Sequence, residues 1–495
     1  MRTRNLLSTL ALGAKAVALT GTAAQAETLR EALAKAYENN PTLTASRAQQ
    51  RAQDENVPIS KSDGLPSASS NAGVEERLFG RGAGTPDRTF NGSVSASVPI
   101  YQGGRVKNAI KAAEQRVEAG QADLRATEAA IFSQTVAAYM DVIRDQAIVS
   151  LNRGNVGVLE VNLEATKDRF QIGDLTRTDI AQSDSRLAIA RGQLRNAEAQ
   201  LISSRERYIE LVGEPPVNLQ APPPLPHMPK SAEDAVQIAL ASNPDIESAQ
   251  RQAEAARFDV KSAKGARMPR VSGTASTGYY NYLGSLDGIT AGSNPDQDGM
   301  TGAAGVSVSF PLFQGGRPAA IVRQAQARQS QAMEIIIATE RSVIAQTRAA
   351  YASHQASQDV IVSSTTAVEA SSLSLEGVRA ENSVGSRTIL DILNAEQELL
   401  NAQVQLVAAE RNAYVAGFSL LAAMGKAEAE DLGLEGGPLY QPEVNYNRVK
   451  DKIWDWDDDP SPTVQSTSTA GTPAQNAVVP DLPRPKAPTQ PPINR

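Results

Sequence analysis

The residue types that carry most enzyme chemistry are scarce in this chain. Cysteine is absent from all 495 residues, which excludes disulfides, thiol chemistry and a lipid-modified N-terminal cysteine. The two histidines, His227 and His354, lie far apart and have no cluster of metal ligands around them. Residues 294–299 resemble the start of a calcium-binding loop, but its twelfth position is Gly305, where such a loop needs Glu. The sequence therefore predicts no enzyme, no cofactor and no metal site.

What the chain contains instead is a repeat. Residues 99–213 recur as residues 311–425 at a constant offset of 212, without an insertion or deletion. Both copies have an aromatic-Gln-Gly-Gly-Arg motif near their start, and Gly173 of the first copy matches Gly385 of the second. A repeat of about 200 residues is too long for a solenoid unit. The sequence predicts an internally pseudo-symmetric structure.

The first 26 residues have the pattern of a secretory signal peptide: two arginines, an apolar stretch, and an Ala-Gln-Ala cleavage site before Glu27. The chain is therefore expected to leave the cytoplasm. Its net charge of −7 becomes more negative once the signal is removed, so a nucleic-acid partner is not expected. No later stretch reaches the roughly 18 apolar residues of a membrane-spanning helix. Entry of the exported chain into a membrane would then depend on strands.

Two segments alternate strictly between apolar and polar residues, which is the pattern of a strand with one apolar and one wet face. They are residues 93–100 and 306–312. Each is expected to pair with a Ser/Thr-rich strand, giving β-hairpins at about residues 65–101 and 269–313. Four strands cannot close a barrel alone, because the smallest barrels need about eight. Either the chain forms half of a soluble sandwich or several chains share one barrel. Three tyrosines within residues 279–282 favour the membrane.

A long helix is expected after each Gly-Gly pair. Residues 105–171 contain no proline, and at 1.5 Å per residue this helix would be roughly 100 Å long. The next segment, joined through Gly173, has an apolar residue every seven positions, and so does its counterpart in the second copy. A seven-residue period predicts left-handed supercoiling of paired helices. We therefore expect coiled-coil hairpins at about residues 103–213 and 315–424. The two apolar seams are Ile180, Leu187, Leu194, Leu201 and Tyr208, and Ile392, Leu399, Leu406, Ala413 and Leu420.

This order of features, present twice, resembles the TolC family of outer-membrane efflux and type I secretion proteins over about residues 27–440. The resemblance implies a mixed fold in a homotrimer. Each chain would give four strands to one twelve-stranded membrane β-barrel and its long helices to an α-helical coiled-coil barrel that forms a tunnel across the periplasm. It also implies a passive exit duct for drugs or secreted proteins, opened when the periplasmic coiled coils untwist. The expected partners are a periplasmic adaptor protein, an inner-membrane transporter of the ABC or RND type, and outer-membrane lipid.

The resemblance and the composition together divide the chain into six parts. They are a cleaved signal peptide at 1–26, a first repeat at 27–214, a proline-rich linker at 215–230, a second repeat at 231–425, an equatorial C-terminal segment at 426–459, and a proline-rich tail at 460–495. The tail is expected to be disordered. Each repeat should open with short helices, the first of which ends at an Asn-Pro pair, Asn40-Pro41 or Asn243-Pro244.

The resemblance places a gate where the coiled coils turn. Thr178, Asp179 and Arg387 match positions at which TolC-like proteins hold the closed tip by polar links between neighbouring coils, so we expect an Asp179–Arg387 bridge. Asp391 matches the first of two acidic positions that narrow the pore, and the second is Asn394 here. Threefold symmetry would repeat Asp391 as a ring of like charges, which attracts cations. The alternative is a solvated carboxylate at a helix start, where Asp is favourable in any case.

The same tips receive the adaptor in the family, which makes Gly173, Leu175, Val384 and Gly385 candidates for docking. A glycine at each turn also has a purely structural explanation, because glycine adopts the left-handed conformation that ends a helix.

Three other functions are compatible with parts of the sequence. A periplasmic adaptor also has helical hairpins and β segments, but adaptors usually have one hairpin per chain and an inner-membrane anchor. A trimeric coiled-coil adhesin would have one continuous stalk rather than a return helix in each copy. An exported enzyme would need a convergent catalytic set, and the residues offer none that rises above common Ser and carboxylate side chains.

Overall fold

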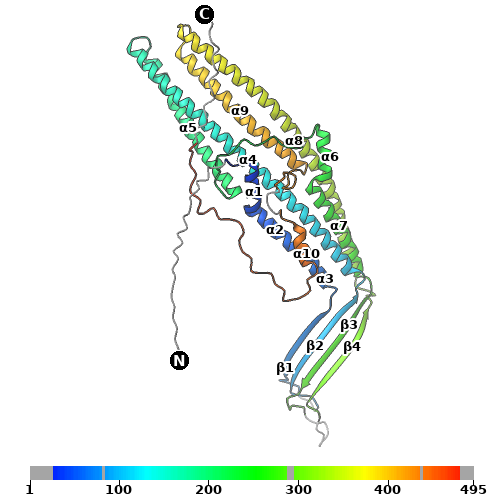
Figure 1. Ribbon diagram of the computed structural model, residues 1–495. Coiled ribbons are helices and arrows are strands. Elements are labelled where there is room, and N and C mark those ends of the chain that lie inside the picture. The colour runs from blue at the N-terminus through cyan, green and yellow to red at the C-terminus, as the bar shows by residue number, and fades with distance from the viewer. Residues whose placement is uncertain (1–25, 81–83, 287–294, 435–438, 480–495) are drawn as a thin grey trace, which may run out of the picture.

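The computed structural model describes residues 26–80, 84–286, 295–434 and 439–479. The molecule is elongated, with a sheet at one end and a body of helices at the other (Figure 1). The expected signal peptide up to residue 25, Asn294 of the calcium-like loop and the end of the proline-rich tail lie outside the described residues.

The four strands form one antiparallel sheet in chain order. They are β1 (Ser67–Glu76), β2 (Arg88–Tyr101), β3 (Arg270–Asn281) and β4 (Asp298–Ser309). The two hairpins are joined, because β2 of the first repeat pairs with β3 of the second. Among the described strands, β1 and β4 each pair on one side only. Each therefore leaves one edge of the sheet free.

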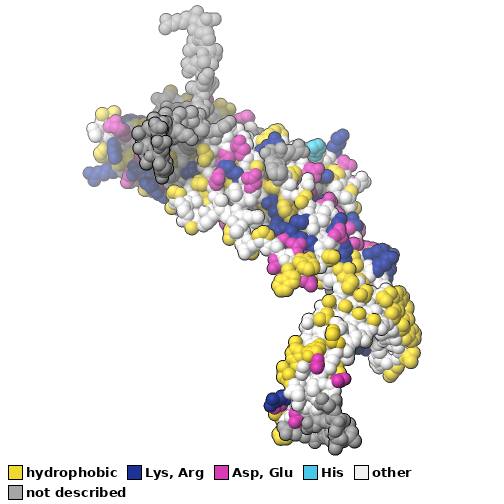
Figure 2. Space-filling model, turned by 60° about the horizontal axis from the view of Figure 1, so that its bottom comes forward, with side chains coloured by type: hydrophobic (Ala, Val, Ile, Leu, Met, Phe, Trp, Pro, Cys, Tyr) yellow, Lys and Arg dark blue, Asp and Glu magenta, His cyan; other side chains and the backbone are white. Residues whose placement is uncertain are grey.

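The alternation in the sequence separates the two faces of this sheet. Val94, Val306 and Val308 share the apolar face, and each is at least 50% exposed. The opposite face carries hydroxyls, such as the Ser69–Ser95 pair at 2.9 Å. Figure 2 shows hydrophobic side chains gathered over the sheet, whereas charged side chains are concentrated on the helical body. A single chain thus leaves a large apolar surface uncovered.

Two long helical hairpins make up most of the body. Their helices are α4 (Arg105–Gln171), α5 (Arg177–Val212), α8 (Arg317–Ser383) and α9 (Ile389–Ala423). α4 and α8 each have 67 residues, so each is roughly 100 Å long. Each begins after a left-handed glycine, Gly104 with φ +76° or Gly316 with φ +80°. α5 packs along α4 and α9 along α8, and the hairpins run side by side (Figure 1).

The described residues also form six shorter helices, which lie between the middle of the body and the sheet (Figure 1). They are α1 (Leu29–Asn39), α2 (Pro41–Asp54), α3 (Asn56–Ser62), α6 (Ala232–Ser242), α7 (Pro244–Gly265) and α10 (Pro442–Val449). The doubled Asn-Pro motif explains how two of them attach. Oδ1 of Asn40 accepts from the N–H of Thr42 at the start of α2, and its Nδ2 donates to the Leu211 carbonyl at the end of α5, both at 3.0 Å. Asn243 does the same for α7 and α9, at 2.9 and 3.0 Å. In both copies the amide fastens a short helix to the end of the return helix.

The main hydrophobic core lies where α1, α4, α5 and the end of α9 meet. Tyr139, Tyr208 and Phe418 are at most 1% exposed there. The Tyr139 hydroxyl bonds the carbonyls of Glu27 and Gln220, at 2.9 and 2.7 Å. Burial raises the pKa of Tyr139, which keeps the hydroxyl a donor at any physiological pH. The segment just before α1 and the proline-rich linker are thus tied to α4.

Within the proline-rich tail, residues 475–478 contact α5. The Arg205 guanidinium donates to the Val478 carbonyl at 2.9 Å, and the Glu206 carboxylate accepts from the N–H of Gln475 at 3.0 Å. Arg205 is only 9% exposed, and a buried guanidinium needs acceptors for its N–H groups. The tail supplies them. Composition does not show such a contact with a distant helix, and the expected disorder of the tail stays a prediction.

No helix in the described part of the chain is both long enough and apolar enough to cross a membrane. Across the same residues, no group of three or more His, Asp or Glu side chains is placed to hold a metal ion. Asp298, from the calcium-like loop, is the first residue of β4 and accepts from the Tyr279 hydroxyl at 3.3 Å.

Candidate gate at the coiled-coil tips

Both hairpins turn in the same way at their tips. Gly173 and Gly385 each have φ +82°, a left-handed conformation that glycine adopts without steric cost. The N–H of each glycine binds back to the last turn of the long helix, to the carbonyl of Phe170 or of Asn382, at 3.0 Å in both copies. This geometry accounts for both glycines as helix terminators. Their part in docking stays a prediction.

A capping box starts each return helix. The N–H of Thr176 donates to the Asp179 carboxylate at 2.8 Å, and the N–H of Thr388 donates to the Asp391 carboxylate at 2.9 Å. Each carboxylate also accepts from the threonine hydroxyl, at 2.7 Å. The backbone bond contributes most for Asp179 and the hydroxyl bond for Asp391, and together they lower the pKa of both aspartates. Both stay ionised at neutral pH, and each has a local structural role whatever else it does.

The apolar tip residues lie at the surface. Val384 is 79% exposed. Its counterpart in the first hairpin, Ile172, is 80% exposed and was missed from the sequence, although the 212-residue offset points to it. Also at the surface are Gly173, Gly385 and Thr178, with Leu175 half-buried.

Arg387 lies at the second tip, and its partner is on its own hairpin. Its Nε donates to the Glu381 carboxylate at 2.7 Å, and this pairing raises the pKa of Arg387. Asp179 is bonded within the first hairpin. Among the described residues of one chain the expected Asp179–Arg387 bridge is therefore not made. It stays a prediction for contacts between neighbouring chains.

The structure shows other polar links between the two hairpins. Glu396 of α9 is 7% exposed, and its carboxylate accepts from Nδ2 of Asn162 in α4 and from Arg379 in α8, at 3.0 Å each. Closer to the tips, Arg186 of α5 donates to Oδ1 of Asn394 at 2.7 Å. Asn394, which the resemblance assigns to the pore, thus joins the two hairpins in one chain. Glu396 is bonded to both long helices at once.

Sequence reasoning missed Glu396 for a physical reason. It lies beside the seven-residue apolar seam of α9, and its partners are in α4 and α8. The periodicity of one helix does not show which other helices its side chains contact. Its counterpart in the first copy, Asp184, is exposed, so comparing the two copies does not indicate a buried link at Glu396 either. Apolar packing accompanies the link, because Leu393 is 2% exposed and packs with residues of α4 and α5. These residues are Leu159, Leu163, Leu187 and Ala190.

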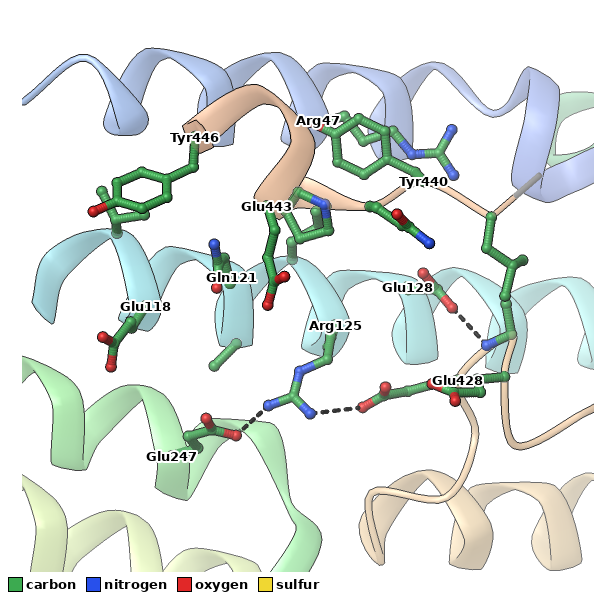
Figure 3. Close-up of a pocket in the computed structure, with 18 of the residues that line it drawn as sticks. Arg47, Glu118, Gln121, Arg125, Glu128, Glu247, Glu428, Tyr440, Glu443 and Tyr446 are labelled. Carbon is green, nitrogen blue, oxygen red and sulfur yellow. Dashed lines mark hydrogen bonds and ion pairs between the residues drawn. The ribbon is translucent and has the colours of Figure 1, made fainter. Parts of the chain in front are cut away.

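A second concave region lies between the shorter helices, away from the tips. It is a cavity of about 1050 Å³ bordered by α2, α4, α7, α10 and the segment after α9. Arg125 pairs there with Glu247 and lies 3.7 Å from Glu428, while Glu128 accepts from the N–H of Ala429 at 2.6 Å (Figure 3). Burial raises the pKa of Glu428 to about 7 and also raises that of Glu128. These contacts fasten the C-terminal segment to α4, and this structural role accounts for the charges.

Comparison with known proteins shows the family to which this chain belongs. The family described as outer membrane efflux protein matches residues 32–214 and 235–426, one match for each repeat. The chain belongs to the TolC family of outer membrane efflux proteins. The resemblance found in the sequence is thereby confirmed. TolC-family proteins are channels and not enzymes.

Two relatives match over most of their length. The outer membrane efflux protein BepC of Brucella suis is 35% identical over 436 residues, which cover 88% of this chain and 93% of BepC. The outer membrane protein TolC of Escherichia coli is 28% identical over 473 residues, which cover 90% of this chain and 94% of TolC.

Solved structures share the fold. The CmeC outer membrane channel of Campylobacter jejuni matches with a TM-score of 0.70 at 17% identity, over 86% of this chain and 89% of that one. The outer membrane protein VceC of Vibrio cholerae matches with a TM-score of 0.68 at 23% identity, over 80% and 96%. The predicted fold class, four antiparallel strands and long helices in duplicated halves, is confirmed. The chain is an outer membrane efflux channel, and not a periplasmic adaptor or an adhesin.

Proposed function

We propose that three copies of this chain form a passive exit duct, which receives cargo from a periplasmic adaptor and an inner-membrane transporter. The observation that carries this proposal is the sheet, with its exposed apolar face and its free edges on β1 and β4. An unpaired backbone N–H or C=O group is costly in the hydrocarbon core of a bilayer, because no water is there to bond it. Strands therefore cross a bilayer only as a closed barrel. Joining β4 of each chain to β1 of the next closes a twelve-stranded barrel. Its apolar face would meet lipid and its serine-rich face the pore.

The long helices support the same assembly. α7 packs along α4 and covers it, whereas α8 exposes Ile321, Ile335 and Ile337. In the sequence repeat, α2 and α3 of the first copy correspond to α7 of the second copy. In the proposed trimer, α2 and α3 of the next chain lie on α8 as α7 lies on α4. Six hairpins then close a tunnel below the barrel.

The tips of these hairpins are the proposed gate. Asp391 forms a threefold ring of carboxylates, and Asp179, with Thr178 beside it, faces Arg387 of the neighbouring chain. Within each chain, the Glu396 contacts and the bond from Arg186 to Asn394 hold the two hairpins together. Opening is an untwisting of the hairpins, and both kinds of link oppose it.

The exposed tip residues are the proposed docking surface for the adaptor. Ile172 and Val384 are apolar, about four-fifths exposed and equivalent by the repeat, so three chains present six such sites. Gly173, Leu175 and Gly385 lie beside them. The transporter behind the adaptor is of the ABC or RND type.

Charge at these two positions tests the docking surface. Ile172→Asp with Val384→Asp should abolish export while the trimer and its resting conductance stay as in the wild type. Val161→Asp is the matched control, because Val161 is 65% exposed on the side of α4, away from the tip. It should leave export unchanged. Export that survives the double substitution would contradict docking at the tips.

Assembly and cargo are tested separately. Outer-membrane fractions run on a semi-native gel should contain a detergent-stable trimer, and a soluble monomer would contradict the duct. Relatives differ in cargo, since one from Pseudomonas aeruginosa is an alkaline protease secretion protein and one from Pseudomonas putida is a toluene efflux pump outer membrane protein. A deletion strain should therefore be assayed both for sensitivity to toxic small molecules and for loss of secreted proteins.

A further inference from the structure

The chain has only two tryptophans, and both lie in one short exposed segment. Trp454 and Trp456 follow α10 and are 73% and 83% exposed. The adjacent Ile453 is 75% exposed. Single apolar residues at a surface are ordinary, but three large ones within four positions form a patch that calls for an occupant.

Ion pairs at the ends of this segment hold it in a turn. Nζ of Lys452 lies 3.1 Å from the Asp457 carboxylate, and Arg448 lies 2.6 Å from the carboxylate of Asp459. The N–H of Asp457 donates to the Trp454 carbonyl at 3.2 Å. Arg448 and Lys452 are thus paired with Asp457 and Asp459, and both indole rings stay exposed outside these pairs.

The turn lies where the helical body meets the sheet. Nζ of Lys61, near the end of α3, donates to the Lys450 carbonyl at 2.7 Å and to the Asp451 carboxylate at 2.8 Å. α3 leads almost directly into β1. Figure 1 shows the segment after α10 reaching down to the height at which α3 gives way to β1. Ile59 of α3 is also exposed, at 64%.

The same end of the sheet carries exposed aromatic residues. Tyr101 and Phe313 occupy the aromatic position of the doubled Gln-Gly-Gly-Arg motif, and they are 48% and 88% exposed. Each lies where its hairpin leaves the sheet for a long helix. Tryptophan and tyrosine gather at membrane surfaces, because their rings are apolar and their N–H or O–H groups are polar. Trp454 and Trp456 add two more exposed aromatic side chains, in the turn that Lys61 fastens to the end of α3.

We propose that Trp454 and Trp456 insert into the periplasmic leaflet of the outer membrane and anchor the helical body against it. This inference rests on the proposed function, since it takes the sheet as the membrane-spanning part. The occupant is lipid because the turn is fastened to the end of α3, at the height where the sheet with its exposed aromatic residues begins. A trimer carries three such turns around the base of the barrel.

Tryptophan emission tests the anchor directly, because every tryptophan of the chain is in this turn. The full-length trimer is compared in amphipol and in phosphatidylcholine vesicles. We expect the emission maximum to move to shorter wavelength in vesicles. Lipids brominated close to the glycerol should quench the emission more than lipids brominated near the chain end. Trp454→Phe and Trp456→Phe assign the signal to each ring.

Three results would overturn the proposal. The emission could be the same in both media and insensitive to brominated lipid, which places the rings in water. It could lie at short wavelength in both media without lipid quenching, which places them against a neighbouring chain. It could shift only when peptidoglycan fragments are added, which makes the occupant a carbohydrate polymer.

A further variant separates failure of the anchor from failure of the duct. Val306→Trp, in a chain that also carries Trp454→Phe and Trp456→Phe, reports the apolar face of the sheet. Quenching of this variant by brominated lipid, with none for the native tryptophans, defeats the anchor alone. Absence of quenching in both defeats the membrane-spanning sheet as well.

Discussion

The two coiled-coil hairpins have the same turn and the same capping box but different surroundings. α4 and α8 have 67 residues each, yet 22 residues of α4 are buried and only five of α8. The first hairpin is covered by helices of its own chain. The second is left open on a face that carries isoleucines and a methionine.

This difference shows that a sequence repeat preserves local features of a hairpin but not the helices that pack against it. The turn at Gly173 or Gly385 and the box at Asp179 or Asp391 depend on neighbours in the same hairpin, so they are reproduced. The cover of each long helix depends on the short helices of the repeat that follows it. For the first copy that repeat is in the same chain, and for the second the proposed trimer supplies it from another chain. In the proposed trimer, the second hairpin is therefore the one whose packing would change if the chains moved relative to one another.

The glycine pairs at the base of the hairpins offer the strongest test of this comparison. A Cβ on Gly103 would overlap the Met268 side chain and lie 2.6 Å from the carbonyl oxygen of Gly265, whereas one on Gly315 meets nothing within 4 Å. Gly103→Ala should destabilise the fold of the chain by about 3 kcal/mol. Gly315→Ala should cost about 1 kcal/mol, the strain of its left-handed backbone. Circular dichroism during thermal unfolding of the refolded chain measures both.

The same pair also tests the trimer. If the next chain covers Gly315 as the second repeat covers Gly103, then Gly315→Ala chains fold but do not assemble. A semi-native gel distinguishes the two states. Normal trimers of Gly315→Ala would break the proposed equivalence.

The buried carboxylate between the hairpins comes next in expected effect. Glu396→Gln weakens charged bonds to Asn162 and Arg379 and should cost about 2 kcal/mol. Asp184→Asn, the matched change in the first copy, alters an exposed side chain and should cost less than about 0.5 kcal/mol. The temperature at which the trimer dissociates reports the difference. Equal shifts for the two variants would mean that Glu396 does not join the hairpins.

The segment after the second hairpin should make stability depend on pH. Burial holds the pKa of Glu428 at about 7, above the 4.5 of an unfolded glutamate. The folded state therefore binds the proton more tightly, so stability falls as pH rises from about 4.5 through about 7 and stays lower above that range. Allowing for partial exposure of the carboxyl, we expect a loss of about 1 kcal/mol. The first hairpin has no such segment, because the position equivalent to Glu428 is Pro216.

Melting temperatures across this pH range provide the measurement. Glu428→Gln should flatten the pH dependence, and Glu233→Gln, a change at an exposed position of α6, should not. A wild type whose stability rises over the same range would contradict the assignment.

The smallest effect is expected at the caps, and it should be equal in the two copies. Thr176→Ala and Thr388→Ala each remove one cap and should each cost about 1 kcal/mol or less. Hydrogen exchange at the first turn of α5 and of α9 measures this fraying. Unequal exchange would show that the tips differ in more than their surroundings.

The fold could be predicted from the sequence because its signals are local or periodic. The alternation of apolar and polar residues predicted strands with two different faces, and the seven-residue period predicted paired helices. The 212-residue offset predicted that the second copy has the same elements as the first. Two features were not predictable in this way. The joining of β2 to β3 and the contact of residues 475–478 with α5 both depend on contacts between distant segments.

The candidate site was only partly predictable for the same reason. The turns could be located from their glycines, and Asp391 could be located from the family resemblance. Glu396 and the bond from Arg186 to Asn394 could not, because they link helices of different repeats and have no equivalent in the first copy. The repeat predicts the features that the two copies share, whereas the proposed gate also uses residues in which they differ.

Conductance of the purified trimer in planar bilayers tests the central claim most directly, namely that three chains form a duct whose gate lies at the coiled-coil tips. The account predicts a low resting conductance in the wild type. It predicts a rise of severalfold in Arg387→Ala with Glu396→Gln, and no rise in the control Asp184→Asn. A protein that forms no channel, or a double variant whose resting conductance equals that of the wild type, would contradict it.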